Sequence, residues 1–304
     1  LMLSSLSLFA THNRAGEITY RYLNGLTYQF TIITYTYTPS PADRPQIEVF
    51  WGDGTSTIIN RNSKTDLGDN ISKNTYISNH SFSSMGTYHI TFEDPNRNAG
   101  IVNIPNSVNI PFFIDNTVII NPFIGTNSSP VLLNPPIDNG CVNVPFYHNP
   151  GAYDIDGDSL SFKIIRCKGF NGENIPGYTF PATSNTFVID PYTGELTWDS
   201  PVLVGEYNIA IQINEYRNRV LIGTMVRDMQ VSIAACNNQP PEIHTLTDTC
   251  VTAGEVLNFE VIVTDPNSSE VTLTATGEPF LLSNSPAFLQ SASGPPPITS
   301  SFIW

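Results

Sequence analysis

The stretch TYQFTIITYTYT (residues 27–38) alternates apolar or aromatic side chains with polar ones over most of its length. Successive side chains of an extended strand point to opposite faces, so this period of two predicts a half-buried β-strand. The pattern recurs in TYHITFE (87–93), YNIAIQIN (207–214) and NFEVIVT (258–264), each bounded by Gly, Pro, Asn or Asp. No stretch shows a sustained period of 3.6 residues, and we therefore expect an all-β protein.

The composition favours β-sandwiches of ordinary size. In a chain of 304 residues, 24 prolines and 20 glycines punctuate the short strand patterns, as in all-β sandwiches. Hydrophobic residues make up 40% of the chain, which suffices for buried cores, whereas charged residues make up only 13%. Much of the polar surface must then come from Asn, Ser and Thr, which suit exposed sheet faces better than helices.

A loose internal repeat narrows the fold class to Ig-like sandwiches. The segments MGTYHITFEDPNRN (85–98) and VGEYNIAIQINEYRN (204–218) share Gly-x-Tyr, an alternating strand, an acidic loop and Arg-Asn. Ig-like sandwiches place a tyrosine corner at such a Gly-x-Tyr, where the hydroxyl bonds to nearby backbone. We therefore expect structural roles for Tyr88 and Tyr207.

Two linkers rich in Pro and Asn divide the chain. They are NPFIGTNSSPVLLNPP (121–136) and CNNQPPE (236–242), where proline stiffens the backbone and cannot continue a ladder. The expected organisation is tandem Ig-like β-sandwiches over 11–122 and 127–236, followed by an incomplete third module over 237–304.

The first ten residues, LMLSSLSLFA (1–10), resemble the tail of a secretory signal peptide with cleavage after Ala10. The alternative is a first β-strand. The sequence stops at SSFIW in the middle of a pattern, and we interpret it as part of a longer protein. No apolar run is long enough to predict a transmembrane segment.

The charge of the chain bears on its partners. With 27 acidic and 13 basic residues the formal net charge is −14. Nucleic acid is a poor partner for such a chain, because binding it requires clustered Lys and Arg. An acidic balance is compatible with divalent cations, and solubility alone explains it equally well.

Four cysteines, at positions 141, 167, 236 and 250, include no CxxC pair. Two disulfides in an oxidising compartment are therefore a better interpretation than a zinc site, and buried free thiols are the alternative. Cys236–Cys250 would close a short loop, worth about 3 kcal/mol through the unfolded chain. Cys141–Cys167 then follows by elimination.

The segments IEVFWGDGTS (47–56) and NHSFSSMGTYHITF (79–92) form a paired motif. A strand that runs into Trp-Gly-Asp-Gly, with a later Gly-x-Tyr, resembles the PKD-type domain, an Ig-like sandwich, over about residues 17–96. The insert RNSKTDLGDNISKN (61–74) is longer than usual for that family. The resemblance implies a spacer or interaction module, in which Asp53 is a turn residue.

The segment AYDIDGDSLSFKI (152–164) places Asp154, Asp156 and Asp158 at alternate positions. Residues two apart point the same way in an extended chain, so three carboxylates can converge on one cation. An EF-hand would need Gly at the sixth position and Glu at the twelfth, between helices, and this segment has neither. A polar turn without a metal is the alternative.

The same segment, with DPYTGELTWDSPVLVGEYNIAI (190–211), resembles the cadherin-like, dystroglycan-type modules of bacterial surface proteins over residues 128–236. That resemblance implies calcium as a possible cofactor, with Glu215 and linker groups such as Asn127 as further ligands. It also implies that calcium stiffens the joint between the modules. The chain has Asn214-Glu215 where many calcium-binding members have Asp.

A second acidic turn lies in VIVTDPNSSEVTLTATG (261–277). Here Asp265, Asn267 and Glu270 replace the richer triplet. Fewer charges mean weaker affinity for calcium, so the interpretation as a turn leads for this segment.

The stretches GEITYRYLNGLTYQFTI (16–32) and EDPNRNAGIVNIPNS (93–107) resemble long secreted proteins of Bacteroidetes-type bacteria. Such proteins carry these modules ahead of a secretion or gliding-associated domain. No P-loop, GxGxxG, HExxH or nucleophile-elbow motif occurs, so we expect no enzyme. The predicted function is a non-catalytic secreted or cell-surface stalk or adhesion module, whose partners are the other modules of the same longer chain. The alternatives are a module that binds an extracellular glycan or protein, and an ancillary segment of a secreted hydrolase.

Overall fold

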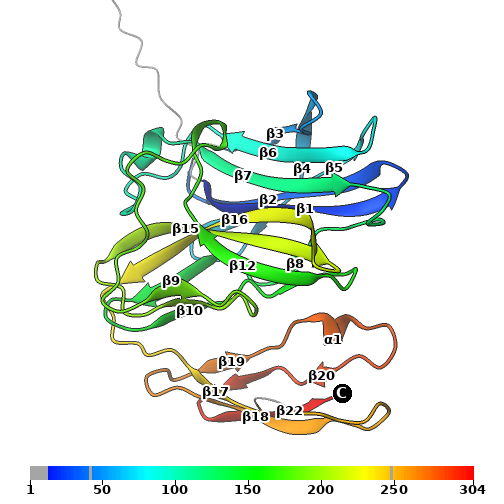
Figure 1. Cartoon of the computed structure of the whole chain (residues 1–304). Coiled ribbons are helices and arrows are strands. Elements are labelled where there is room, and N and C mark those ends of the chain that lie inside the picture. The colour runs from blue at the N-terminus through cyan, green and yellow to red at the C-terminus, as the bar shows by residue number, and fades with distance from the viewer. Residues whose placement is uncertain (1–12, 41–42, 247–248) are drawn as a thin grey trace, which may run out of the picture.

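The computed structural model describes residues 13–40, 43–246 and 249–304, and these residues fold almost entirely into β-strands (Figure 1). The predicted signal peptide, residues 1–10, lies outside the described residues. The four alternating stretches all form strands: β2 (Thr27–Tyr37), β6 (Gly86–Asp94), β15 (Gly205–Arg217) and β18 (Asn258–Thr264). The all-β prediction is confirmed.

The first unit contains seven strands in the hydrogen-bonded order β1-β2-β5-β4-β3-β6-β7. Its core surrounds Trp51 and Phe30, both fully buried. The unusually long insert turns out to be the end of a hairpin. Besides β2 and β6, the strands are β1 (Asn13–Asn24), β3 (Gln46–Phe50), β4 (Ser56–Asp66), β5 (Ile71–Ser81) and β7 (Phe112–Ile120).

The second unit packs a sheet of β12, β15, β16 and β9 around a core that contains Trp198. Two small sheets, β10-β14-β13 and β11-β8, complete it. Its strands besides β15 are β8 (Val131–Leu132), β9 (Ile137–Cys141), β10 (Phe146–His148), β11 (Ala152–Tyr153), β12 (Ser159–Ile165), β13 (Phe187–Ile189), β14 (Leu196–Trp198) and β16 (Val220–Ala234).

The third unit is smaller, and one pass of the chain joins it to the second unit (Figure 1). Its core holds four buried residues, Val261, Val263, Val271 and Leu273. Its elements besides β18 are β17 (Glu242–His244), β19 (Val271–Leu273), α1 (Glu278–Leu281), β20 (Phe288–Leu289), β21 (Ala292–Gly294) and β22 (Ile298–Ile303). Short 3₁₀ turns occur at η1 (Ser107–Asn109) and η2 (Phe170–Gly172) in the first two units.

Both predicted tyrosine corners are present. The hydroxyl of Tyr88 donates to the carbonyl of Ser84 at 2.8 Å, and that of Tyr207 donates to the carbonyl of Leu203 at 2.8 Å. Each tyrosine therefore fixes the backbone four residues before it, as in the tyrosine corner of Ig-like sandwiches. Asp53 is a turn residue: its carboxylate accepts from the amide of Thr55 at 2.9 Å.

Strand β16 belongs to both of the first two units. It pairs with β15 along its length, with β7 around Thr224, and with β1 at Asp228. The first two units therefore lie side by side and share one sheet, whereas the sequence predicts separate sandwiches joined by a linker. Strand periodicity says which face of a strand is buried and not which distant strand lies beside it.

Buried ion pairs fasten β16 to the first unit. Arg97 donates two hydrogen bonds to the Asp228 carboxylate, at 3.1 and 2.6 Å, and both side chains are at most 1% exposed. Next to it, Arg227 donates to Glu17 at 2.6 Å. The amide of Asn208 also donates to Asp228, at 2.8 Å. Charges removed from water this completely are stable only when they are paired and hydrogen-bonded.

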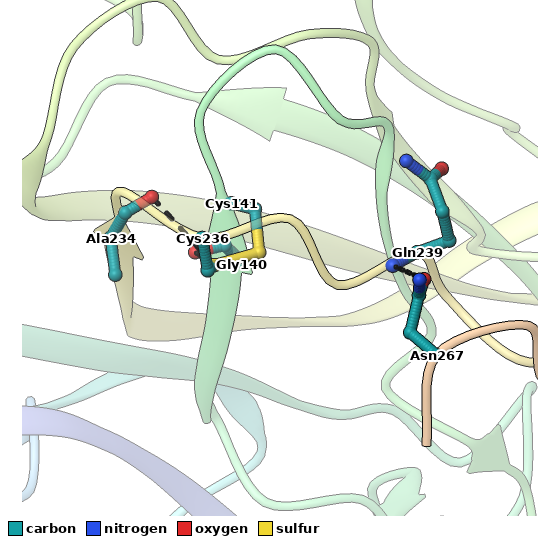
Figure 2. The surroundings of a disulfide bond; sticks show 6 residues. All are labelled: Gly140, Cys141, Ala234, Cys236, Gln239 and Asn267. Carbon is teal, nitrogen blue, oxygen red and sulfur yellow. Dashed lines mark hydrogen bonds between the residues drawn. A yellow bond between two sulfur atoms is a disulfide. The ribbon is translucent and has the colours of Figure 1, made fainter.

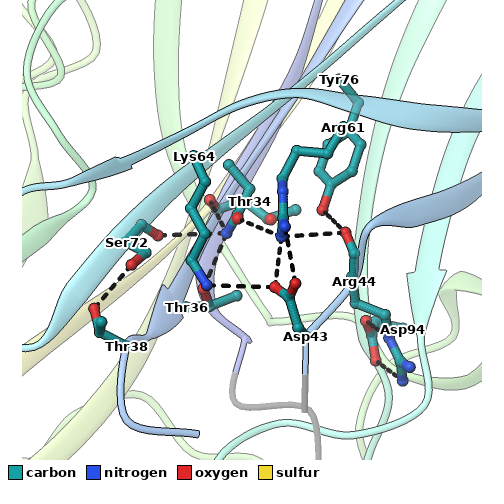
Figure 3. Close-up of polar contacts among 11 residues, drawn as sticks. Thr34, Thr36, Thr38, Asp43, Arg44, Arg61, Lys64, Ser72, Tyr76 and Asp94 are labelled. Carbon is teal, nitrogen blue, oxygen red and sulfur yellow. Dashed lines mark hydrogen bonds and ion pairs between the residues drawn. The ribbon is translucent and has the colours of Figure 1, made fainter. Parts of the chain in front are cut away.

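A second polar network holds the segment before β3 onto the sheet (Figure 3). Arg61 donates two hydrogen bonds to the Asp43 carboxylate, and Arg44 donates to the Asp94 carboxylate at 2.9 Å. The hydroxyl of Tyr76 donates to the Arg44 carbonyl at 2.6 Å. The bond from Arg61 lowers the pKa of Asp43 to about 2. These contacts are structural.

The predicted disulfides Cys236–Cys250 and Cys141–Cys167 are wrong. The structure contains a Cys141–Cys236 bond, with the two Cα atoms 5.2 Å apart (Figure 2). It leaves Cys167 buried and Cys250 exposed as free thiols. The reason is strand pairing: β9 runs parallel to β16 with Cys141 beside Ala234, so Cys236 reaches Cys141 just past the strand end. Cys236 and Cys250 are close in sequence, but the long-range register of β9 on β16 decides which cysteine Cys236 meets.

Peptide mapping without reduction should find Cys141 linked to Cys236. Iodoacetamide should label Cys250 in the folded protein and Cys167 only after unfolding, because burial raises the pKa of the Cys167 thiol. Cys236→Ala should lower the free energy of unfolding by about 3–5 kcal/mol, whereas Cys250→Ala should leave it unchanged. Rapid labelling of native Cys167 would contradict this assignment.

Because β16 completes both units, they should unfold together. Trp51 reports the first core and Trp198 the second, and both are fully buried. Each core can be followed by one tryptophan if the exposed Trp304 is replaced and either Trp198→Phe or Trp51→Phe is introduced. The urea unfolding of each variant is followed by fluorescence and normalised to the fraction unfolded in that background. We expect the two normalised curves to superimpose. Asp228→Asn should lower the stability at both reporters by about 3–5 kcal/mol, since it leaves Arg97 buried without its partner. Separate transitions would show that the units are independent.

Candidate metal centre

The Asp-rich loop between β11 and β12 is a turn and not an extended chain. The amide of Gly157 donates to the Asp154 carbonyl at 3.3 Å, and Gly157 has a φ of 80°. One oxygen of Asp154, Oδ1, accepts from the amides of Asp156 and Asp158 at 2.9 and 3.0 Å. The expected alternation along a strand therefore does not arrange these carboxylates; the turn does.

Three of the predicted ligands come together. Ligand oxygens of Asp154, Asp158 and Glu215 lie within 4.8 Å of one another. Glu215 reaches the loop from β15, where it pairs with Leu160 of β12. Asp154 is 5% exposed and Glu215 is 1% exposed. The cluster is thus a buried acidic centre at the end of the β12–β15 ladder.

A glycine on the shared strand makes room for this centre. Gly223 of β16 lies opposite Glu215, and a Cβ atom there would fall 2.6 Å from Glu215 Oε2. It would also lie 3.5 Å from the hydroxyl oxygen of Tyr20. Any larger residue at position 223 would displace the carboxylate.

The predicted ligand Asn127 lies at the edge of the cluster. Its amide nitrogen donates to the Tyr20 hydroxyl at 3.0 Å, which ties the connection between the units to β1. Asp156 does not join the three carboxylates: its Oδ2 accepts from the amide of Ser128 at 2.7 Å. Asp156 thus ties the connection to the acidic loop, whereas Asn127 ties it to β1.

Arg217 is a cation that is built into the site. Its guanidinium makes two hydrogen bonds to the Asp158 carboxylate and donates to the carbonyls of Ile124 and Thr126, each at 2.8 Å. A further bond runs to Asn127 Oδ1 at 3.1 Å. Arg217 therefore neutralises one carboxylate of the cluster and leaves the other two to each other.

The carboxyl groups of Asp154 and Glu215 each have one oxygen without a hydrogen-bond partner among the described residues. Asp154 Oδ2 and Glu215 Oε1 are buried and accept no hydrogen bond within the described part of the chain. Burial, followed by the charge of Asp154, raises the pKa of Glu215 to about 9, and burial also raises the pKa of Asp154. Two such groups can stay buried if they share a proton or if they share a cation.

Sequence reasoning missed Tyr20, Arg217 and Gly223. Tyr20 belongs to the other unit, and nothing local links it to the acidic loop. Arg217 did carry a signal, because it stands in the repeated Arg-Asn of the two Gly-x-Tyr segments. Gly223 interrupts an otherwise bulky strand, which often marks a close approach of another group.

The second predicted acidic turn has a different role. Asp265 accepts from the amides of Asn267 and Ser268, both at 2.8 Å, and this lowers its pKa. Asn267 accepts a hydrogen bond from the amide of Gln239 at 2.8 Å and so ties the third unit to the chain segment that follows β16 (Figure 2). Glu270 is exposed. Among the described residues, only the Asp154 cluster has the spacing of a metal site.

Comparisons with known proteins identify no family for the chain. No family model and no curated protein matches it. One similar solved structure is described as the crystal structure of Dscam1 isoform 6.44, N-terminal four Ig domains, with 8% identity over 95% of each chain and a TM-score of 0.22. At that identity and score the likeness carries no argument. The strand pairings and tyrosine corners define the class, an all-β protein of Ig-like sandwiches. No helix among the described residues is long and apolar enough to cross a membrane.

The raised pKa of Glu215 predicts a pH dependence in the absence of metal. The folded state keeps this proton up to about pH 9, whereas the unfolded chain loses it near pH 4.3. The folded state therefore binds more protons between these values, and the free energy of unfolding should fall as pH rises, by at most roughly 1.4 kcal/mol per pH unit. Urea midpoints in EDTA between pH 5 and pH 8 measure this slope, and Glu215→Gln should flatten it. An unchanged slope in that variant would exclude Glu215 as its cause.

Proposed function

We propose that this protein is a non-catalytic extracellular adhesion or display module, in which Ca²⁺ bound at the acidic cluster fastens the first two units. The observation that carries the proposal is the pair of buried, unpartnered oxygens, Asp154 Oδ2 and Glu215 Oε1. The large majority of buried polar atoms in native proteins have partners, and here a bound cation would supply one to both oxygens. The Cys141–Cys236 disulfide supports an oxidising, extracellular location.

The donor set favours calcium over other common metals. Asp154, Asp158, Glu215 and Asn127 offer oxygen atoms, and neither His nor Cys belongs to the cluster. Oxygen-only ligands of mixed type, carried on a turn and a strand, suit the flexible coordination of Ca²⁺. Zinc would favour nitrogen and sulfur, and Mg²⁺ demands a stricter octahedron.

The site lies at the junction between the first two units. It joins the connection at Asn127, the acidic loop at Asp154, and β15 at Glu215, and Tyr20 of the first unit adjoins it. Bound calcium would add an electrostatic clamp to the pairing of β16 with both units. A rigid body of this kind would hold an adhesive or catalytic part of a longer secreted protein at a distance from the cell. The resemblance to PKD-type and cadherin-like bacterial modules supports the same role.

A thermal melt of the whole chain tests the cation. Extracellular calcium modules have dissociation constants of about 0.1–1 mM, so 1 mM Ca²⁺ after EDTA should add roughly 0.4–1.4 kcal/mol. For a cooperative body of this size the melting temperature should rise by about 1–5 °C. Asp154→Asn should remove the shift, and the matched variant Asp265→Asn, in the second acidic turn, should retain it.

Three results would count against the proposal: no shift with calcium, an equal shift with Mg²⁺, or a shift that survives in Asp154→Asn. The first would leave the carboxyl pair as a proton-sharing structural element. The last would place calcium elsewhere in the protein.

A further inference from the structure

A groove of about 590 Å³ lies on the outer face of the first unit and shares no lining residue with the acidic cluster. Its floor is β6, where His89, Thr91 and Glu93 face outward and alternate with buried core residues. One wall is the glycine turn at residues 52–55, and Asn171 lines the opposite side. A groove of this volume can hold a small molecule or a segment of a polymer.

Both units contribute residues to the groove. Asn171 belongs to η2 of the second unit, and its amide donates to Glu93 Oε2 at 2.8 Å. The neighbouring Gly172 lies against the ring of Phe113, where a Cβ atom would be 2.8 Å from the ring edge. The second unit therefore contributes one side of a groove whose other lining residues belong to the first unit.

The walls of the groove are preorganised. Gly52 presses against β6 so closely that a Cβ atom would lie 2.5 Å from the amide nitrogen of His89. Asp53 holds the same turn through Thr55 and through His80, whose Nε2 lies 2.8 Å from the carboxylate. A ligand would therefore bind without having to order these segments.

The exposed groups combine one aromatic ring with several hydrogen-bonding groups. Phe50 lines the groove and is 48% exposed. Three polar groups have no hydrogen-bond partner among the described residues: Glu93 Oε1, His89 Nε2 and the Thr91 hydroxyl. The other polar atoms of Glu93 and His89 are occupied, Glu93 Oε2 by the Asn171 amide and His89 Nδ1 by Thr117. A pyranose ring presents an apolar C–H face that packs on an aromatic ring, while its hydroxyls bond to planar polar side chains at the edge.

The charge of the groove selects among carbohydrates. Neither Lys nor Arg lines it, and Glu93 contributes a negative charge. Asp115, which pairs with Thr91 on the neighbouring strand, is neutralised by Lys168 at 2.8 Å. An anionic ligand would meet the Glu93 carboxylate and no lysine or arginine in the lining.

We propose that this groove binds a neutral carbohydrate, with a sugar ring packed on Phe50 and its hydroxyls bonded to Glu93 and His89. This inference adds a ligand to the proposed display module and does not rest on the calcium site.

Affinity electrophoresis of the whole chain tests the proposal. Native gels would contain xyloglucan, mixed-linkage β-glucan, galactomannan, xylan or starch, with polygalacturonate as the anionic comparison. At least one neutral polysaccharide should retard the protein. Phe50→Ala should weaken the apparent affinity at least about tenfold, and Glu93→Gln should weaken it several-fold. The matched control is Phe123→Ala, which removes a ring that is 94% exposed on the connection between the units.

The variant Asp154→Asn, assayed in EDTA, should still bind the polysaccharide, which separates this proposal from that of the calcium site. Unchanged melting temperatures of Phe50→Ala and Glu93→Gln would show that the variants are folded. No retardation by any of the neutral polysaccharides, stronger retardation by polygalacturonate, or full binding by Phe50→Ala would each overturn the proposal.

Discussion

The ion pair between Arg97 and Asp228 is the interaction on which the arrangement of the first two units depends. Both side chains are withdrawn from water, so each is tolerated only in the presence of the other. Asp228 stands on β16 and Arg97 on the segment after β6, and a shift of β16 by one residue would turn Asp228 to the other face of the sheet. The pair therefore specifies the register of the strand that both units share. The acidic centre requires that register, because Gly223 of β16 lies opposite Glu215 and leaves room for its carboxylate.

Local features of the fold could be predicted from the sequence, because they depend on neighbours in the chain. The alternation in residues 27–38 identified β2, and Gly-x-Tyr identified both tyrosine corners. The side-by-side packing could not be predicted in this way. It depends on which exposed strand edge β16 covers, and a pattern of period two is the same for every partner. The predicted disulfides are wrong for the same reason. Cys141 and Cys236 are 95 residues apart and meet only through the parallel pairing of β9 with β16.

In the candidate site, too, the local features could be predicted from the sequence and the long-range contacts could not. Three acidic residues of the prediction converge, yet they converge through a turn in which Asp154 caps the amides of Asp156 and Asp158. The missing part of the site comes from the repeated Arg-Asn. In the first copy Arg97 enters the interface with β16, and in the second copy Arg217 binds the acidic loop and the connection. Two arginines at equivalent places in a repeat thus fasten two different junctions. Their shared position was visible in the sequence, whereas their partners were not.

The use of basic residues also shapes the surface. The structure describes all 13 basic residues, and eight of them form ion pairs with carboxylates: Arg14, Arg44, Arg61, Lys64, Arg97, Lys168, Arg217 and Arg227. In a chain of net charge −14, positive charge is therefore largely committed to internal contacts, and much of the field outside the protein is negative. Such a surface repels anionic polymers and attracts divalent cations. Uncharged ligands can then be recognised only through hydrogen bonds and aromatic contacts, which is the chemistry that Phe50 and its neighbours on β6 present.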